Sequence, residues 1–136
     1  MAITSHFIET EFVVLSPDKT ATKEPADGTL YQRLDETYNN FRGHELIACH
    51  EFGSDWGMWE MHPEGDEIVL LMSGDVTFVL QLEDGENTVR LQRPGAYVVV
   101  PKGIWHTART DTTSKLLFIT PGEATQHRDS PLLQGH

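Results

Sequence analysis

The stretch from Gly57 to Glu67 reads GMWEMHPEGDE and determines how the rest of the sequence is interpreted. A second stretch, PKGIWH from Pro101 to His106, follows Gly95 after five intervening residues. Each stretch places side chains that can bind a metal beside a Gly/Pro turn, between strand-like runs. If the fold brings the two together, Glu60, His62, Glu67 and His106 offer two imidazoles and two carboxylates to one cation.

The chain around these stretches consists of short apolar runs divided by turn residues. Residues 75–82 show the clearest pattern, in which apolar and other side chains alternate with a period of two. No helical segment separates the runs, which is typical of an antiparallel sandwich or barrel and not of a parallel α/β fold. We predict strands at residues 45–50, 56–61, 67–72, 75–82, 89–91, 96–100, 104–109 and 116–120.

The predicted protein is a single all-β domain with a short N-terminal arm, because 136 residues suffice for one core. The arm, residues 1–43, combines a strand at 12–15, a loop at 16–28 and one or two helical turns within 30–41. Residues 44–122 form the barrel. Residues 123–136 form a polar tail that we expect to be loose at its end.

The composition excludes several classes of function. A net charge of -11 argues against nucleic acid, which requires a basic patch, and against anionic membranes. Cys49 is the only cysteine, so no intrachain disulfide can form, and this fits a reducing compartment. The first eleven residues lack the features of a signal peptide, and no apolar run approaches the roughly 20 residues of a membrane helix. We expect a soluble, cytoplasmic protein.

Both stretches carry spacings that resemble the two motifs of the cupins, small β-barrels of the jelly-roll type. The second motif is nearly complete: Gly95, five residues, Pro101-x-Gly103, two residues and His106, with Thr110 where the family has Asn. The resemblance implies a jelly-roll barrel over residues 44–120.

The first motif matches from its second histidine onward and departs before it. His62 is followed after four residues by Glu67, and then after six residues by Gly74. Glu60 stands where the family has its first histidine, and Gly57 is closer to it than the pattern expects. The resemblance implies that His62, Glu67 and His106 occupy the family's metal-ligand positions, inside the mouth of the barrel. It implies nothing for Glu60.

The role of Glu60 rests on chemistry. Residues two apart on a strand share a face, so Glu60 and His62 point the same way and can reach one ion. Glu60 is then a fourth ligand, a general base in a metal-free site, or a hydrogen-bonding group for the bound ligand. Two imidazoles and two carboxylates suit Fe, Mn, Zn or Ni, and the harder oxygen ligands favour Fe or Mn.

Strand alternation also predicts the surroundings of the site. Trp59 and Met61 face away from Glu60, and Trp105 faces away from His106, so these side chains form an outward apolar patch and predict a homodimer. His50 is assigned to the core in preference to the pocket. His44, His127 and His136 lack a motif and are expected to be exposed. The predicted pocket wall consists of Met58, Phe78, Tyr97, Ile104 and Ala108.

The leading hypothesis is a metal-dependent enzyme that acts on a small molecule, either a dioxygenase or an isomerase/lyase. One alternative is a non-catalytic cupin that binds or senses a small ligand. Another is a metal-free cupin of the sugar-epimerase type, in which Glu60, His62 and His106 perform acid/base work. The loss of the first motif histidine favours this last alternative over an ordinary metal cupin.

Overall fold

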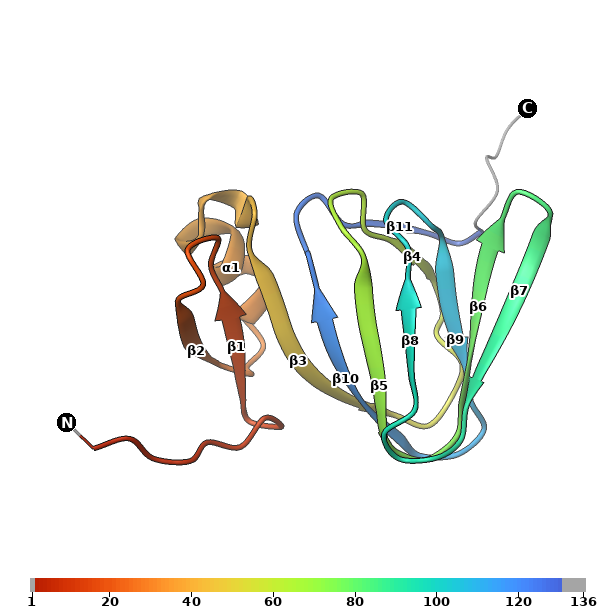
Figure 1. The fold of residues 1–136 in the computed structure, drawn as a ribbon, viewed down its shortest axis with the longest axis horizontal. Helices are drawn as coiled ribbons and strands as arrows, with labels where there is room; N and C mark the ends of the chain where they lie inside the picture. The colour runs from red at the N-terminus through yellow and green to blue at the C-terminus, as the bar shows by residue number, and fades with distance from the viewer. Residues whose placement is uncertain (1, 131–136) are drawn as a thin grey trace.

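The structure, a computed structural model, describes residues 2–130 and consists of two facing antiparallel sheets (Figure 1). Its helical elements are α1 (Leu30–Thr37) and the 3-10 turn η1 (Asn39–Phe41). The strands are β1 (Glu11–Leu15), β2 (Ala21–Pro25), β3 (Glu45–Phe52), β4 (Trp59–Met61), β5 (Glu67–Ser73), β6 (Val76–Leu82), β7 (Gly85–Leu91), β8 (Tyr97–Val100), β9 (His106–Arg109), β10 (Ser114–Thr120) and β11 (Gln126–Arg128).

The sheet order explains how distant motifs meet. One sheet has six strands in the order β2-β1-β3-β10-β5-β8, and the other has five in the order β11-β4-β9-β6-β7. All pairings are antiparallel. The strand β4 pairs with β9, so the two motif halves are neighbours in one sheet, and β5 faces them from the other. The all-β jelly-roll prediction is confirmed.

The core between the sheets follows the predicted alternation. In β6, Val76, Phe78 and Leu80 are buried, and in β10 Leu116 and Phe118 are buried from the opposite sheet. Because side chains on a strand alternate between faces, this register places polar groups outside and apolar groups between the sheets. A core of this kind holds both sheets at a fixed separation and so fixes the distance across which Glu67 meets the other site residues.

The N-terminal arm is more ordered than the sequence predicts. The strand β2 lies inside the segment expected to be a loop, where it pairs with β1 at the edge of the six-stranded sheet. It escaped prediction because an exposed edge strand needs no apolar face. The helix α1 agrees with the predicted helical turns, and its buried Leu30 and Leu34 pack with Phe12, Val14 and other side chains in a second apolar cluster.

The C-terminal segment contributes a strand that was not predicted. Residues 126–128 form β11 and pair with β4, which brings His127 opposite Glu60. The strand predicted at 56–61 is shorter in the structure, where β4 begins at Trp59. His136 lies outside the described residues.

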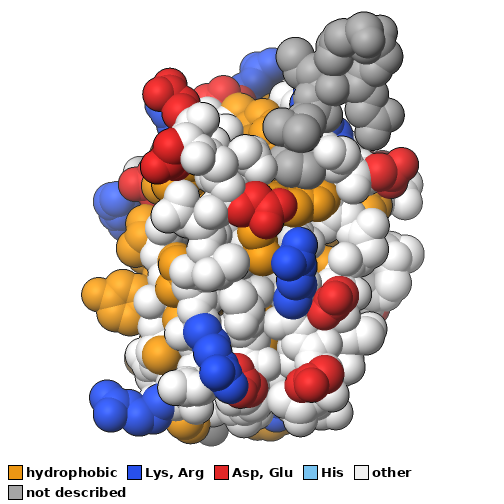
Figure 2. Space-filling view, turned by 90° about the vertical axis from the view of Figure 1, so that its right-hand side faces the viewer, with side chains coloured by type: hydrophobic (Ala, Val, Ile, Leu, Met, Phe, Trp, Pro, Cys, Tyr) orange, Lys and Arg blue, Asp and Glu red, His pale blue; other side chains and the backbone are white. Residues whose placement is uncertain are grey.

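Within residues 2–130, no helix has the length and apolarity needed to span a bilayer. On the face shown in Figure 2, acidic and basic side chains are scattered without a continuous basic patch.

Candidate metal centre

Four polar side chains from three strands and a turn meet between the sheets. Glu60 of β4 and His106 of β9 are direct register partners. His62 follows β4 in the chain, and Glu67 begins β5 on the opposite sheet. His62, Glu67 and His106 are almost fully buried, at 5%, 3% and 0% exposure. The structure therefore brings together all four residues that the sequence singled out as ligands.

The distances between these groups fit a single cation. Glu67 Oε2 is 3.3 Å from His62 Nε2, and Glu67 Oε1 is 3.2 Å from His106 Nε2. Glu60 Oε1 is 3.8 Å from His106 Nε2 and 4.0 Å from His62 Nε2. Adjacent ligands bound at about 2.1 Å to one metal are separated by roughly 3.0–3.5 Å. Only a small inward movement of Glu60 is needed to complete a four-ligand set.

Hydrogen bonds at the outer nitrogens fix both imidazoles in the tautomer that a metal requires. His106 Nδ1 donates to the Ile104 carbonyl at 3.1 Å. His62 Nδ1 is 2.9 Å from Thr125 Oγ1. Thr125 donates its own proton to the Gly122 carbonyl at 3.0 Å, so its oxygen accepts from His62. Nε2 is therefore the nitrogen of each imidazole that a metal would bind after displacing its proton, as in histidines that bind metals.

Three buried polar atoms at this point have no hydrogen-bond partner among the described residues. They are His62 Nε2, Glu67 Oε1 and His106 Nε2. Glu67 meets the two imidazoles in ion-pair contacts of 3.3 and 3.2 Å. Leaving a buried polar atom unpaired costs about 1–3 kcal/mol, and one cation would satisfy all three. Glu60, His62 and His106 also each offer a ligand atom within 4.8 Å of the others, which makes them a candidate metal triad.

The electrostatics of the centre keep Glu67 ionised. Burial alone raises the pKa of its carboxyl, but the imidazoles of His106 and His62 outweigh that effect and hold the pKa at about 2. Thr120 Oγ1 also donates to Glu67 Oε2 at 2.6 Å. Burial lowers the pKa of His106, whereas the Glu67 carboxylate raises it by more. An ionised carboxylate between two imidazoles is a negative centre prepared for a cation.

Comparison with known proteins agrees with this architecture. No family model and no curated protein matches the sequence. Among solved structures, oxalate oxidase is 16% identical with a TM-score of 0.51, over 60% of this chain and 44% of that chain. A protein with a cupin-2 domain from Shewanella frigidimarina is 23% identical with a TM-score of 0.48, over 57% of this chain and 70% of that one. Hydroquinone 1,2-dioxygenase from Sphingomonas sp. TTNP3 is 19% identical with a TM-score of 0.49, over 56% and 58%.

This chain has the jelly-roll fold that cupin-domain structures share. The resemblance drawn from the two motifs is thereby confirmed, whereas likeness at this level does not transfer an activity. The matched segment spans less than half of oxalate oxidase. The activity of this protein depends on the chemistry of its own site.

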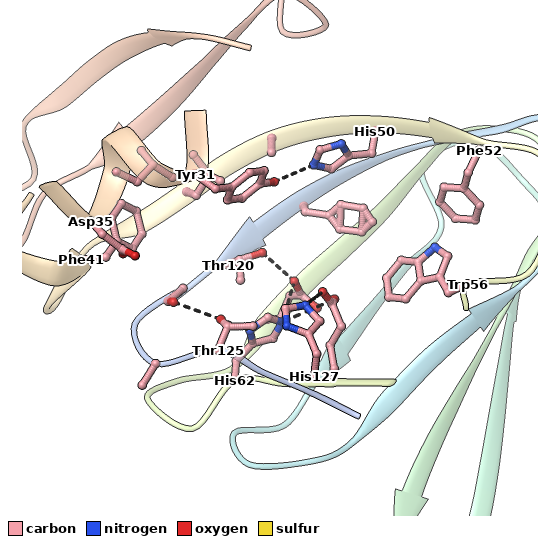
Figure 3. A pocket seen from close by; sticks show the side chains of 18 residues that line it. Tyr31, Asp35, Phe41, His50, Phe52, Trp56, His62, Thr120, Thr125 and His127 are labelled. Carbon is pink, nitrogen blue, oxygen red and sulfur yellow. Dashed lines mark hydrogen bonds and ion pairs between the residues drawn. The ribbon is translucent and has the colours of Figure 1, made fainter. Parts of the chain in front are cut away.

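A cavity of about 600 Å³ opens beside the four site residues (Figure 3). The N-terminal arm supplies one wall through α1, and the C-terminal segment supplies another through Thr125 and His127. The lining is mainly apolar and aromatic. It comprises Tyr31, Leu34, Asp35, Phe41, Leu46, Ala48, His50, Phe52, Trp56, Glu60, His62, Glu67, Phe118, Thr120, Gly122, Ala124, Thr125 and His127.

None of the five predicted wall residues lines this cavity. Phe78 and Ala108 are fully buried in the core between the sheets, and Ile104 packs against that core. Met58 and Tyr97 are 43% and 63% exposed. The predicted wall used residues on β6, β8 and β9 and residues just before β4 and β9, whereas the cavity opens toward β3 and the N-terminal arm. No motif in the arm marks Tyr31 as a wall residue.

The other histidines and the aromatic patch also differ from expectation. His50 lines the cavity instead of the core and lies 3.0 Å from the Tyr31 hydroxyl. His127 is 47% exposed at its side chain, as predicted, but it also contacts Glu60. Trp105 is half-buried, because the Arg128 guanidinium of β11 lies 4.5 Å from its ring centroid. The outward patch expected to drive dimerisation is therefore partly covered by the chain itself.

Proposed function

We propose that this cupin is a metal-dependent enzyme that acts on an uncharged small molecule, with Glu60, His62, Glu67 and His106 as its metal ligands. The convergence of three buried, unpaired ligand atoms beside a partly open cavity carries the proposal. A structural metal would need no such cavity, and a site without metal leaves those atoms unsatisfied.

The ligand set favours iron or manganese. Two carboxylates balance the charge of a divalent ion, and oxygen ligands are harder than the imidazole that Glu60 replaces. An added anionic ligand also stabilises a more oxidised metal, which suits redox chemistry better than hydrolysis. When bound, the metal would supply Lewis acidity or activate O2. We therefore rank a dioxygenase first and an isomerase or lyase second.

The lining of the cavity restricts the substrate. Among residues 2–130 it contains the carboxylates of Asp35, Glu60 and Glu67 but no Lys or Arg. An anionic group entering the cavity would have the three carboxylates as repelling neighbours. The aromatic walls formed by Trp56 and Phe118 suit an apolar body. These features support an uncharged, largely apolar substrate with an oxygen that reaches the metal.

Metal analysis tests the proposal directly. Protein purified without chelator should contain about one equivalent of Fe or Mn, with anomalous diffraction placing the ion between His62 and His106. His106→Ala should retain less than about a tenth of this metal, while His6→Ala, which alters an exposed histidine of the N-terminal arm, should retain all of it. Full metal loading in His106→Ala would exclude the assigned centre.

A free coordination position on the metal can be tested without knowing the substrate. The anaerobic Fe(II) protein should bind nitric oxide, an O2 surrogate, and give the high-spin iron–nitrosyl signal in electron paramagnetic resonance. A metal-loaded protein that gives no such signal would favour the isomerase or lyase chemistry, in which O2 does not take part.

A metal-free enzyme is the second candidate, favoured by one observation. Glu67 already lies within 3.3 Å of both imidazoles and could neutralise a shared proton without a metal. Glu60, 26% exposed at its side chain and facing the cavity, would then be the base. Less than about a tenth of an equivalent of any metal after growth in supplemented medium, together with no uptake by the purified protein, would select this candidate.

We further propose a homodimer formed through the outward face of the six-stranded sheet. A row of β-branched side chains crosses five strands in register: Val13, Ile47, Ile119, Ile68 and Val99. Ile68 and Val99 are 37% and 44% exposed. With strands about 4.8 Å apart, the four gaps between these five strands make the row about 19 Å long.

A second copy is the occupant that suits this face, since an unbroken row of β-branched side chains is complementary to itself under two-fold symmetry. Val99→Lys should convert a dimer in sedimentation velocity to a monomer. Thr88→Lys adds the same charge on exposed β7 of the other sheet and should leave the dimer intact. A monomeric wild-type protein at micromolar concentration would exclude the dimer.

A further inference from the structure

We propose that Tyr31 and His50 form a second binding point for the substrate, across the cavity from the candidate metal centre, where they hydrogen-bond a hydroxyl or carbonyl group. The substrate would then be an elongated, uncharged molecule with a flat apolar body and an oxygen at each end. This inference rests on the proposed function, which supplies the first oxygen-binding point.

The two side chains come from separate parts of the fold and meet at the cavity wall. Tyr31 lies in α1 of the N-terminal arm, and His50 lies in β3. Tyr31 Oη and His50 Nε2 are 3.0 Å apart, and the two rings stack with an interplanar angle of 19°. Both line the same cavity as Glu60 and His62, and Figure 3 shows the pair on the side opposite His62.

Both groups are neutral at neutral pH. Burial lowers the pKa of His50, although the nearby Glu60 acts in the other direction. Partial desolvation of the Tyr31 hydroxyl by the surrounding protein, with a smaller contribution from Glu60 and Glu67, raises its pKa to about 12. A hydrogen bond between a neutral phenol and a neutral imidazole uses only one proton. The phenol oxygen can therefore form a further hydrogen bond.

This further hydrogen bond suits a ligand hydroxyl whichever way the Tyr31–His50 hydrogen bond runs. If Tyr31 donates to His50 Nε2, the phenol oxygen accepts a hydrogen bond from the ligand. If His50 donates from Nε2, the phenol proton is free to bond a ligand oxygen. A hydroxyl group both donates and accepts, so it fits either tautomer, and a carbonyl fits the second. Tyr31 is 57% exposed, so its free side is accessible to a ligand.

An aromatic wall connects the two ends of the cavity. The ring centroids of His50 and Phe118 are 5.6 Å apart, those of Phe118 and Trp56 are 6.0 Å apart, and those of Trp56 and His106 are 6.3 Å apart. Offset and edge-on contacts with such a wall favour a flat apolar body. A substrate held at both ends would lie along this wall.

The competing explanation is that the Tyr31–His50 pair only ties α1 to β3. The two explanations make different predictions for removal of the Tyr31 hydroxyl oxygen. Tyr31→Phe keeps the stacked ring and deletes the hydroxyl, so a purely structural tie predicts a change in stability and no change that depends on the ligand. A binding point predicts a loss confined to ligands that carry the second oxygen.

The test uses isothermal titration calorimetry with matched pairs of probes on the metal-loaded protein. The shorter set is phenol against catechol, resorcinol and hydroquinone, and the longer set is 2-naphthol against 2,6- and 2,7-naphthalenediol. At least one diol should bind about 2- to 10-fold more tightly than its mono-ol, the range of one net hydrogen bond. Tyr31→Phe should abolish this advantage and leave the mono-ol affinity unchanged.

Tyr38→Phe is the matched control. Its hydroxyl donates to Glu24 Oε2 within the arm at 2.5 Å, and Tyr38 does not line the cavity. It should preserve the diol advantage. A diol advantage that survives Tyr31→Phe, or its absence across the whole panel in protein that binds metal, would overturn the inference and leave the metal proposal intact. Metal content is measured on the same samples, and its absence from wild-type protein would instead end the proposed function. Titrating His106→Ala with the same probes then tests the binding point at Tyr31 and His50 without the metal.

Discussion

His127 of β11 lies directly opposite Glu60 of β4 in the sheet register, and its Nε2 is 3.0 Å from Glu60 Oε2. The other carboxylate oxygen, Oε1, faces the imidazoles of His62 and His106. One oxygen of Glu60 is thus held by the C-terminal strand while the other points at the candidate centre. In metal sites, partners of this kind orient a ligand and tune its strength.

The variant His127→Ala should therefore weaken metal binding about 10-fold, because Glu60 loses the group that orients it. Thermal stability should change little, since the His127 side chain is 47% exposed. Competition with a coloured chelator measures the affinity, and His6→Ala serves as the control for removal of an exposed histidine. An affinity unchanged by His127→Ala would mean that Glu60 is not a ligand or needs no support.

Glu60→His examines the departure from the family motif. If Glu60 is a ligand, the variant should still bind one equivalent of metal, with a shift in preference from Fe or Mn toward Zn or Ni, because imidazole is softer than carboxylate. Glu60→Gln removes the charge at similar size and should weaken binding at least about 10-fold. Metal content after dialysis against an equimolar mixture of the four ions reports the preference. Identical profiles for all three proteins would place Glu60 outside the coordination sphere.

The turn at Gly74 should tolerate no side chain. Its φ of +100° disfavours other residues, and an added Cβ would lie 2.6 Å from the Ser114 backbone Cα. We expect Gly74→Ala to lower the free energy of unfolding by at least about 2 kcal/mol, from overpacking combined with backbone strain. Urea denaturation measures the loss. Gly57→Ala is the matched control, because nothing lies within 4 Å of its added Cβ. Equal stability of the two variants would contradict the tight turn.

The sequence predicted what local pattern and motif spacing determine. Period-two alternation in residues 75–82 identified β6 and its buried face, because that alternation is a direct consequence of strand geometry. The spacing from His62 to Gly74 and from Gly95 to His106 predicted which groups would converge, because two spaced motifs constrain both the strands and their turns. Pairing of β4 with β9 then placed Glu60 opposite His106.

What escaped prediction depends on contacts between distant segments. Tyr31 reaches the cavity because α1 packs over β3, and nothing local to residues 30–37 encodes that docking. Thr125 and His127 reach it because β11 adds to β4, a pairing of three polar residues with no apolar signature. Two walls of the cavity are thus built by the two terminal segments, which are the parts of the chain with the weakest sequence pattern.

Glu67 should give the metal-free protein a distinctive dependence of stability on pH. Its folded pKa of about 2 is below the reference value of 4.5, since the two imidazoles outweigh the burial that would raise it. A lowered folded pKa contributes stability that is present above pH 4.5 and is lost as the pH falls toward 2. Urea unfolding of chelator-treated protein should therefore show a smaller loss between these pH values for Glu67→Gln than for wild type. Glu51→Gln, at a carboxyl whose side chain is 58% exposed, should keep the wild-type slope. Parallel curves for wild type and Glu67→Gln across this window would mean that the carboxyl is not held ionised between the imidazoles, and the negative centre on which metal binding depends would be lost with it.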